Sequence, residues 1–311
     1  MKLVSVIIPC YKDSKTLCRA INSVIAQSYK PIEIIVINDC SPETKIIDKY
    51  IKKYPRIKYF CNKENLGLAV SRNKGIQLAK GDIVAFLDAD DEYHPDKIKI
   101  QLEYLEKNTA ITCEVLNILP SGESYSKLGP DRSIIKPREI IFSNKLNGAG
   151  LLCLKKLILS VGGYNPNLKS CEDFDLWLRL LSSGIKVKVV SKPLYLYHFN
   201  PEGLSKNIRN ISKWELRVIQ QHASSMDLNW QNNFDYTLAI FIWLMKHLLR
   251  SEEAGNHELR KETLKSGVLL NKFSILRSLF YIIGYLRICF FFVLLKKYFL
   301  SNSLFKKLNE A

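Results

Sequence analysis

Short apolar runs alternate with amphipathic stretches through the first 107 residues, and this alternation limits the folds that the chain can adopt. Four apolar runs have the length and continuity of strands that are buried on both faces: residues 3–9, 32–38, 57–61 and 82–87. Helical spacing of apolar residues follows each run, in residues 14–27, 43–54, 66–79 and 95–107. Strand–helix alternation at this repeat length predicts right-handed βαβ units, and therefore an α/β fold with a mostly parallel sheet flanked by helices.

Polar residues lie directly after three of the predicted strands, namely Asp39, Asn62 and Asp88. An open α/β sheet binds its ligands at the carboxyl ends of its strands, so we expect these side chains to border one site. An aspartate at the position of Asp39 can accept hydrogen bonds from a nucleobase or a ribose. It can equally form a turn or cap a helix, and the position alone favours neither interpretation.

The fourth predicted strand runs into the acidic sequence Asp88-Ala89-Asp90-Asp91. If the backbone stays extended there, the carboxylates of Asp88 and Asp90 point the same way. Carboxylate oxygens suit Mg²⁺ or Mn²⁺, which complete their shells with water and substrate phosphates. The alternative is an acidic turn in which one aspartate caps the helix that begins near Pro95. The position after a buried strand favours the metal–diphosphate interpretation.

The stretch 65–75 has the pattern of a loop that enters a helix, and it carries Arg72 and Lys74. Both cations can complement a diphosphate near the start of a helix, and both can instead form a solvated basic face. Neither the G-x-G-x-x-G dinucleotide fingerprint nor a P-loop is present in the sequence.

Glu172 and Asp173 open a predicted helix that extends to Ser183. Asp173 can act as a general base, or it can stand third in a helix that Ser170 caps, and the spacing favours the capping interpretation. His198 is one of only five histidines in the chain. A lone histidine is more often structural, although its ring can also supply a nitrogen to a metal or phosphate site.

These patterns follow one another in a fixed order along residues 1–205: the strand that ends in Pro9-Cys10-Tyr11, then Asn38-Asp39, the stretch 65–75, the aspartates 88–91, Glu172-Asp173 and His198. In order and spacing they resemble the family 2 glycosyltransferases with the GT-A fold, a Rossmann-like α/β fold. The chain departs from the usual pattern of that family in the residues after Asp39 and after His198.

The resemblance implies a role for each of the matching residues. A nucleotide-binding set follows from it: Pro9, Tyr11, Asp39, Arg72 and Asp88. Asp90 and His198 would hold Mg²⁺ or Mn²⁺, and Asp173 would be the general base of an inverting transfer.

By this resemblance, the chain is expected to be a metal-dependent inverting glycosyltransferase. The expected donor is a nucleotide-sugar that carries UDP, and the expected acceptor is a hydroxyl of a glycan or lipid-linked molecule in lipopolysaccharide, O-antigen or capsule biosynthesis. A sugar-1-phosphate nucleotidyltransferase is an alternative, but that class has a glycine-rich N-terminal loop that residues 8–13 lack. A non-catalytic, membrane-attached nucleotide-binding module is the non-enzymatic alternative.

Helical spacing replaces the strand–helix alternation in the last third of the chain. We therefore expect a GT-A domain over 1–205 and a helical C-terminal extension over 206–311. Within 272–307, basic residues flank the apolar run 279–295, which is shorter than the roughly 20 residues that cross a bilayer and contains Arg287. An interfacial membrane anchor is favoured over a spanning helix, and a buried helix or dimer contact is the third interpretation.

The formal net charge of +16 indicates an anionic partner, such as nucleic acid, an anionic lipid or a phosphorylated substrate. No helix-turn-helix signature, zinc-finger spacing or RNA-binding aromatic motif is present in the sequence, so we expect no nucleic-acid partner. The first nine residues contain only a short apolar run and lack the features of a signal peptide. The expected location is therefore the cytoplasm, with peripheral association at the inner face of the plasma membrane.

Overall fold

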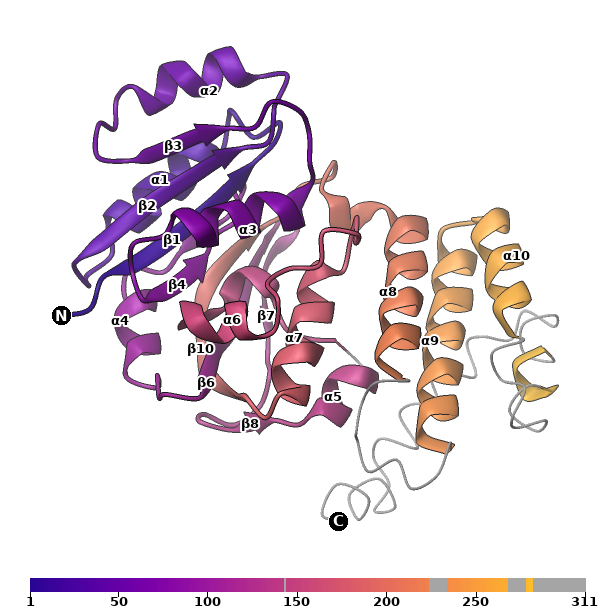
Figure 1. Ribbon diagram of the computed structural model, residues 1–311. Coiled ribbons are helices and arrows are strands. Elements are labelled where there is room, and N and C mark those ends of the chain that lie inside the picture. The colour runs from indigo at the N-terminus through magenta and orange to yellow at the C-terminus, as the bar shows by residue number, and fades with distance from the viewer. Residues whose placement is uncertain (143, 224–233, 268–277, 282–311) are drawn as a thin grey trace. The chain divides into compact units, whose positions relative to one another are not determined.

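The structure is a computed structural model that describes residues 1–142, 144–223, 234–267 and 278–281. It divides into two compact units, Met1–Lys206 and Asn207–Ala311. The first unit contains one ten-stranded sheet with helices packed on it, and the described part of the second unit is helical (Figure 1).

Four parallel strands form the first half of the sheet, in the spatial order β3 (Lys58–Cys61), β2 (Ile32–Asn38), β1 (Val4–Cys10) and β4 (Ile83–Phe86). Their registers run without interruption, and Val6 of β1 lies beside Ile34 of β2 and Ala85 of β4. The connecting helices are α1 (Leu17–Ile25), α2 (Thr44–Ile51) and α3 (Leu68–Leu78). The predicted βαβ alternation and the α/β fold are therefore confirmed.

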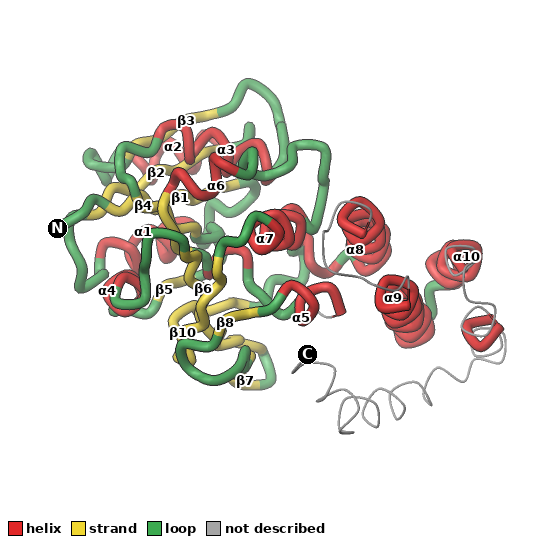
Figure 2. Tube along the Cα trace, turned by 60° about the horizontal axis from the view of Figure 1, so that its bottom comes forward, coloured by secondary structure: helices red, strands yellow, loops and turns green. Residues whose placement is uncertain are grey.

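The second half of the sheet mixes strand directions. β9 (Leu152–Leu154) lies antiparallel between β4 and β6 (Thr109–Leu119), and β10 (Lys186–His198) runs parallel to β6. Three short strands complete the sheet: β5 (Glu92–Tyr93) and β8 (Ile134–Ile135) beside β10, and β7 (Gly122–Ser126) beside β6. The remaining helices of this unit are α4 (Lys97–Leu102), α5 (Pro137–Phe142), α6 (Lys155–Ser160) and α7 (Glu172–Ser182), as Figure 2 shows. The predicted helix over 95–107 is shorter than expected, because only α4 forms there.

Different helices cover the two faces of the parallel strands. Val6 and Ile8 of β1 share a buried cluster with Leu17 of α1, and strand alternation places Ile7 on the opposite face. On that face α3 packs against β1, and a Cβ atom added to Gly75 of α3 would lie 2.3 Å from Cγ2 of Ile7. The close approach of α3 to β1 therefore depends on a glycine at this position.

Three helices of the second unit are described: α8 (Ile208–Ala223), α9 (Phe234–Glu253) and α10 (His257–Lys265). Glu215 of α8 accepts hydrogen bonds from two side chains of α9, at 2.6 Å from Arg250 and 3.1 Å from His247. In the part of the chain that the structure describes, no helix is long and apolar enough to cross a membrane. The predicted membrane-associating segment 272–307 lies outside the described residues except for 278–281.

The contact between Gly75 and Ile7 gives a first testable prediction. We expect Gly75→Ala to lower the free energy of unfolding by about 1–3 kcal/mol, because the added methyl group forces either α3 or Ile7 to move. Urea denaturation measures the change. Gly150→Ala is the matched control, because a Cβ atom there meets its neighbours only at ordinary contact distances of 3.7 Å or more. Equal losses in the two variants would contradict the steric explanation.

Candidate active site

The carboxyl ends of β1 and β2 are joined around Asp39. The amide of Asp39 donates to the carbonyl of Cys10 at 2.9 Å, and its carboxylate is almost fully buried. That carboxylate accepts hydrogen bonds from Asn62 Nδ2 at 2.7 Å, Leu66 N at 3.0 Å and Gly67 N at 2.7 Å. Since a carboxylate offers about four acceptor positions, Asp39 both fixes the loop before α3 and keeps capacity for one further donor.

The loop after β1 lies over the same edge of the sheet. Pro9 is buried within β1, whereas the side chain of Tyr11 is 40% exposed. Asp13 accepts a hydrogen bond from the amide of Tyr11 at 2.9 Å, and Lys12 donates its own amide to Ser41 Oγ at 3.0 Å. Tyr11 is therefore an accessible aromatic ring on a loop that is fixed at both sides.

Arg72 of α3 reaches Glu172, which lies 100 residues further along the chain, and also Asp88. Its Nη2 donates to Asp88 Oδ1 at 2.8 Å, and its Nη1 donates to Glu172 Oε1 at 2.7 Å. The Tyr164 ring lies against the guanidinium, 5.3 Å from ring centroid to Cζ. Arg72 is 2% exposed, so both of its Nη groups are used inside the protein. We call Arg72, Asp88 and Glu172 the arginine bridge.

The arginine bridge contains more acid than base, and Arg72 and Glu172 are buried while Asp88 is half-buried. Burial raises the pKa of Glu172 to about 7, although the charge of Arg72 opposes this shift. The nearby acids, Asp88 first among them, hold the pKa of Arg72 above its usual value despite its burial. Removal of either the arginine or its acidic partners would leave an uncompensated charge in the interior.

Asp91 ties the loop after β4 to the last strand. Its Oδ2 accepts from the Tyr195 hydroxyl at 2.7 Å, and its Oδ1 accepts from the His198 amide at 2.8 Å. Asp91 is 1% exposed, and this burial raises its pKa to about 8. Asp91 is therefore a structural member of the aspartate series, and Asp88 and Asp90 remain for a ligand.

Asp90 lies beside a residue that the sequence patterns did not single out. Its Oδ2 accepts a hydrogen bond from Asn200 Nδ2 at 2.9 Å, and burial, followed by the charge of Asp88, raises the pKa of Asp90. His198 contacts a different acid, because its Nε2 lies 2.7 Å from Glu92 Oε1. Asn200, two residues after His198, is thus the residue of this segment that touches Asp90.

The carboxylates of Asp88 and Asp90 are the groups after β4 that could bind a metal ion. In the described residues, no group of three or more His, Cys, Asp or Glu side chains could hold a metal ion by itself. Asp88 gives one oxygen to Arg72 and Asp90 gives one to Asn200, so each keeps a second carboxylate oxygen. This set fits Mg²⁺ or Mn²⁺, which take one or two protein carboxylates and complete their shells with water and substrate phosphates.

Asp173 stands at the start of α7, directly after Glu172. Its Oδ1 accepts a hydrogen bond from the Phe174 amide at 2.7 Å, and burial raises its pKa. A Cβ atom at Gly148 would lie only 2.3 Å from Cβ of Asp173, so the backbone of the turn Gly148–Gly150 packs directly on this side chain. The predicted cap at Ser170 is wrong, because the N-cap residue is Cys171. The backbone of Cys171 is left-handed (φ 61°), and its side chain forms no capping hydrogen bond.

Comparisons with known proteins agree on one family. The model of the family described as glycosyl transferase family 2 matches residues 5–151. An uncharacterized glycosyltransferase of Haemophilus influenzae is 28% identical over 250 residues, which cover 76% of this chain and 83% of that protein. The putative teichuronic acid biosynthesis glycosyltransferase TuaG of Bacillus subtilis is 31% identical over 219 residues, which cover 68% of this chain and 83% of TuaG.

Solved structures show the same fold. The structure of S. aureus TarS 1-349 in complex with UDP is similar with a TM-score of 0.56 at 20% identity, over 79% of this chain and 80% of that chain. GalNAc-T7 with UDP, GalNAc and Mn²⁺ has a TM-score of 0.54 at 21% identity, over 71% of this chain and 48% of that chain. The predicted GT-A fold is therefore confirmed.

The arginine bridge gives a second prediction. We expect Arg72→Ala to lower the free energy of unfolding by about 3–5 kcal/mol, because it leaves the buried Glu172 and the half-buried Asp88 without their cation. Chemical denaturation measures this loss. Arg209→Ala is the control, since Arg209 pairs with Glu258 and Glu262 on the surface, where we expect little change. The bridge would lose its structural role if both arginine variants unfolded at the same denaturant concentration.

Proposed function

The chain belongs to glycosyltransferase family 2, and on this basis we propose that its Met1–Lys206 unit is a metal-dependent inverting enzyme that uses a UDP-sugar. The acceptor in this proposal is a hydroxyl of a glycan or lipid-linked molecule in the assembly of a surface polysaccharide. The observation that carries the proposal is the arginine bridge, because Arg72 contacts both Asp88 and the residue next to Asp173. A donor-side carboxylate and a candidate base thus border one site.

The proposed nucleoside pocket consists of Pro9, Tyr11 and Asp39. Tyr11 offers an exposed ring on which a base can stack, and Asp39 keeps capacity for one donor, such as the imide N–H of uracil. The UDP in the TarS structure supports this choice of nucleotide. In this proposal the buried Arg72 does not bind the diphosphate directly. It donates a hydrogen bond to Asp88 and so orients that carboxylate toward the ribose or the metal.

Asp90, together with Asp88, is the proposed holder of Mg²⁺ or Mn²⁺, and the Mn²⁺ in the GalNAc-T7 structure supports a divalent ion. When bound, such an ion supplies Lewis-acid stabilisation of the leaving diphosphate. Asn200 holds one oxygen of Asp90 and so orients the other. His198 is a further proposed ligand, and it would join the ion only if its ring exchanged Glu92 for the metal.

Asp173 is the proposed general base. A carboxylate whose pKa is raised by burial accepts a proton more readily at neutral pH than an ordinary aspartate does. In the proposed step, the acceptor oxygen forms a bond to the anomeric carbon while the bond from that carbon to the nucleoside diphosphate breaks on the opposite face. The hydroxyl proton passes to Asp173. Gly148 and the Phe174 amide fix the side chain that receives it.

The C-terminal extension, and within it the segment 272–307, is the proposed membrane-associated part of the chain. The basic residues of 272–307 support contact with anionic lipid at the inner face of the plasma membrane. This arrangement would bring the catalytic unit to a lipid-linked acceptor.

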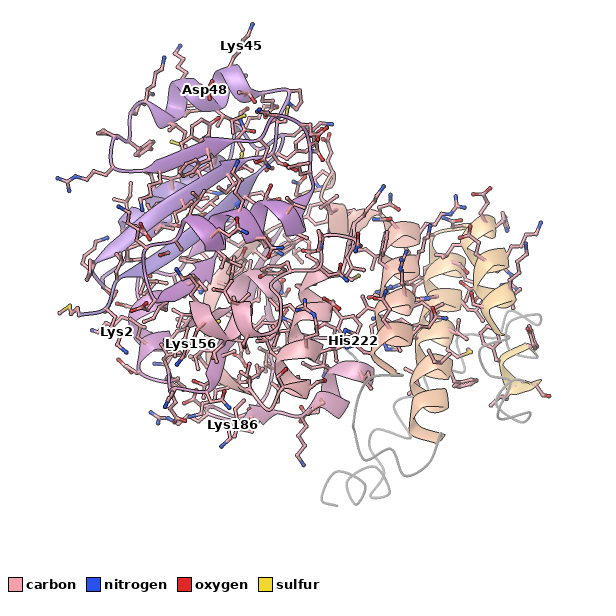
Figure 3. All side chains as sticks on the ribbon, viewed as in Figure 1. Lys2, Lys45, Asp48, Lys156, Lys186 and His222 are labelled. Atoms are coloured by element: carbon pink, nitrogen blue, oxygen red, sulfur yellow. The ribbon has the colours of Figure 1, made fainter. Side chains whose placement is uncertain are left out.

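The role of Asp173 can be tested by one substitution. We expect Asp173→Asn to lower turnover by about 10²–10⁴-fold, since this is the usual contribution of general-base assistance. The affinity for UDP should stay within about threefold of the wild-type value. Radiolabelled sugar transfer and calorimetric UDP titration measure the two quantities. Asp48→Asn is the control, because Asp48 lies on α2 (Figure 3) and its carboxylate accepts a hydrogen bond from Tyr59, away from the candidate base. Residual transfer near the wild-type rate would remove Asp173 from the role.

The metal site gives a separate prediction. We expect Mn²⁺ together with UDP to raise the melting temperature of the wild-type protein, because a ligand that binds only the folded state stabilises it by mass action. Asp90→Asn should abolish the Mn²⁺-dependent part of the rise, and Asn200→Ala should weaken Mn²⁺ affinity about 10–100-fold. Asn22→Ala, an exposed asparagine of α1, should leave the affinity unchanged. Full Mn²⁺ stabilisation of the Asp90→Asn protein would place the metal elsewhere.

A further inference from the structure

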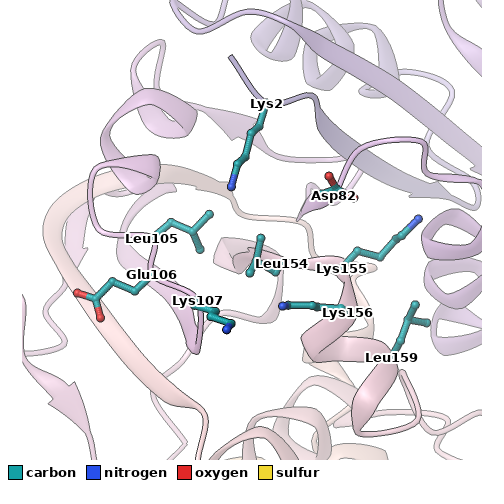
Figure 4. A pocket seen from close by; sticks show the side chains of 9 residues that line it. All are labelled: Lys2, Asp82, Leu105, Glu106, Lys107, Leu154, Lys155, Lys156 and Leu159. Carbon is teal, nitrogen blue, oxygen red and sulfur yellow. The ribbon is translucent and has the colours of Figure 1, made fainter.

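A pocket lies at the edge of the sheet where the parallel strands begin. It has a volume of about 520 Å³, and its lining residues come from the segments before β1, β4 and β6, from the end of β9 and from α6 (Figure 4). The residues are Lys2, Asp82, Leu105, Glu106, Lys107, Leu154, Lys155, Lys156 and Leu159. We call this cavity the lysine pocket.

The lysine pocket is separate from the candidate active site. The active-site residues follow the carboxyl ends of β1 to β4, whereas the pocket residues Lys2 and Asp82 precede the amino ends of β1 and β4. A seven-residue strand such as β1 spans about 23 Å. The two sites therefore lie at opposite edges of the same sheet, and a ligand in one does not touch the other.

Three ammonium groups in the lysine pocket have no partner among the residues that the structure describes. Lys2, Lys107 and Lys156 are exposed, and their Nζ atoms form no ion pair or hydrogen bond with a described residue. Figure 4 shows these side chains reaching the pocket from three different segments, around Leu154. Lys155 differs, because its Nζ donates to the carbonyl of Ala79 at 2.9 Å.

The acids of the lysine pocket do not neutralise these lysines. Glu106 is hydrogen-bonded to Lys188, and its carboxylate points away from the other lining side chains in Figure 4. Asp82 is the other lining acid, and it forms no ion pair with a described residue. The pocket therefore keeps an excess of positive charge, and an anion placed between the lysines would relieve their mutual repulsion.

The size and the apolar part of the lysine pocket limit which anion fits. Leu105 and Leu154 are half-buried and Leu159 is 51% exposed, so uncharged surface adjoins the ammonium groups. The volume falls in the range of small-molecule sites, about 300–1,000 Å³, and exceeds what one inorganic phosphate fills. Compact ammonium groups bind phosphate as point charges, without the fork geometry of arginine.

We propose that the lysine pocket binds an organic phosphate, with the phosphate between Lys2, Lys107 and Lys156 and the organic part on Leu105, Leu154 and Leu159. This chemistry has two sources, a soluble phosphate ester and the glycerophosphate headgroup of an anionic lipid. The proposal is independent of the proposed transfer reaction, because no residue of the pocket belongs to the candidate active site.

The test uses the full chain with its donor site saturated by UDP, so that added phosphate reports only on other sites. Glycerol 3-phosphate is titrated by calorimetry, and binding to phosphatidylglycerol and phosphatidylcholine vesicles is measured by sedimentation. The variant is Lys107→Ala with Lys156→Ala. Its control is Lys45→Ala with Lys49→Ala, which removes the same charge from exposed positions of α2; Figure 3 shows Lys45 away from Lys2 and Lys156.

We expect saturable binding of glycerol 3-phosphate that weakens at least tenfold in the pocket variant and stays unchanged in the control. A loss that is confined to phosphatidylglycerol vesicles would assign the pocket to the lipid headgroup. Equal behaviour of the pocket variant, the control and the wild-type protein toward both probes would overturn the proposal. Failure to bind UDP would count against the proposed function alone, since the comparison of the pocket variant with its control still reports on the lysine pocket.

Discussion

The buried contact of Arg72 with Asp88 and Glu172 is the interaction on which the candidate active site depends. Arg72 reaches its position because α3 lies close against β1, and that closeness requires Gly75 beside Ile7. A guanidinium that is 2% exposed is stable only with partners, and the two available acids come from the end of β4 and the start of α7. The packing of one helix thereby fixes the distance between the donor-side carboxylate and Asp173.

The same site contains more acidic than basic side chains, so its negative charge is only partly compensated. Burial raises the pKa of Asp13 to about 7 and that of Asp91 to about 8, and the carboxylates of Asp88 and Asp90 add to both shifts. Acids kept close together in a mostly buried site disfavour one another's ionisation, and a divalent ion with a diphosphate would reverse that preference. These neighbouring acids lower the stability of the folded protein, and a bound cation would reduce their repulsion. Such a loss of stability is typical of functional sites.

The sheet presents opposite charge at its two edges. Aspartates follow the carboxyl ends of the parallel strands, and lysines surround the amino ends. The formal net charge of +16 therefore says little about the candidate active site, which is acidic, and more about surfaces elsewhere on the chain. Anion binding at the lysine pocket and metal–diphosphate binding at the strand ends are compatible because the length of the strands separates them.

The sequence by itself determined the βαβ series, the parallel strands and the residues that follow them, because periodic burial is a local property of the chain. It also placed Asp39, Asp88 and Asp90 at one edge of the sheet, since parallel strands end on the same side. Only the tertiary structure decided which residues are in contact: Arg72 with Glu172, Asp90 with Asn200, and the backbone of Gly148 with Asp173. These pairs are separated by long stretches of chain, and whether they touch depends on how closely helices and loops pack on the sheet. Local spacing carries no such information, which is why it favoured a Ser170 cap where the chain forms a left-handed turn at Cys171.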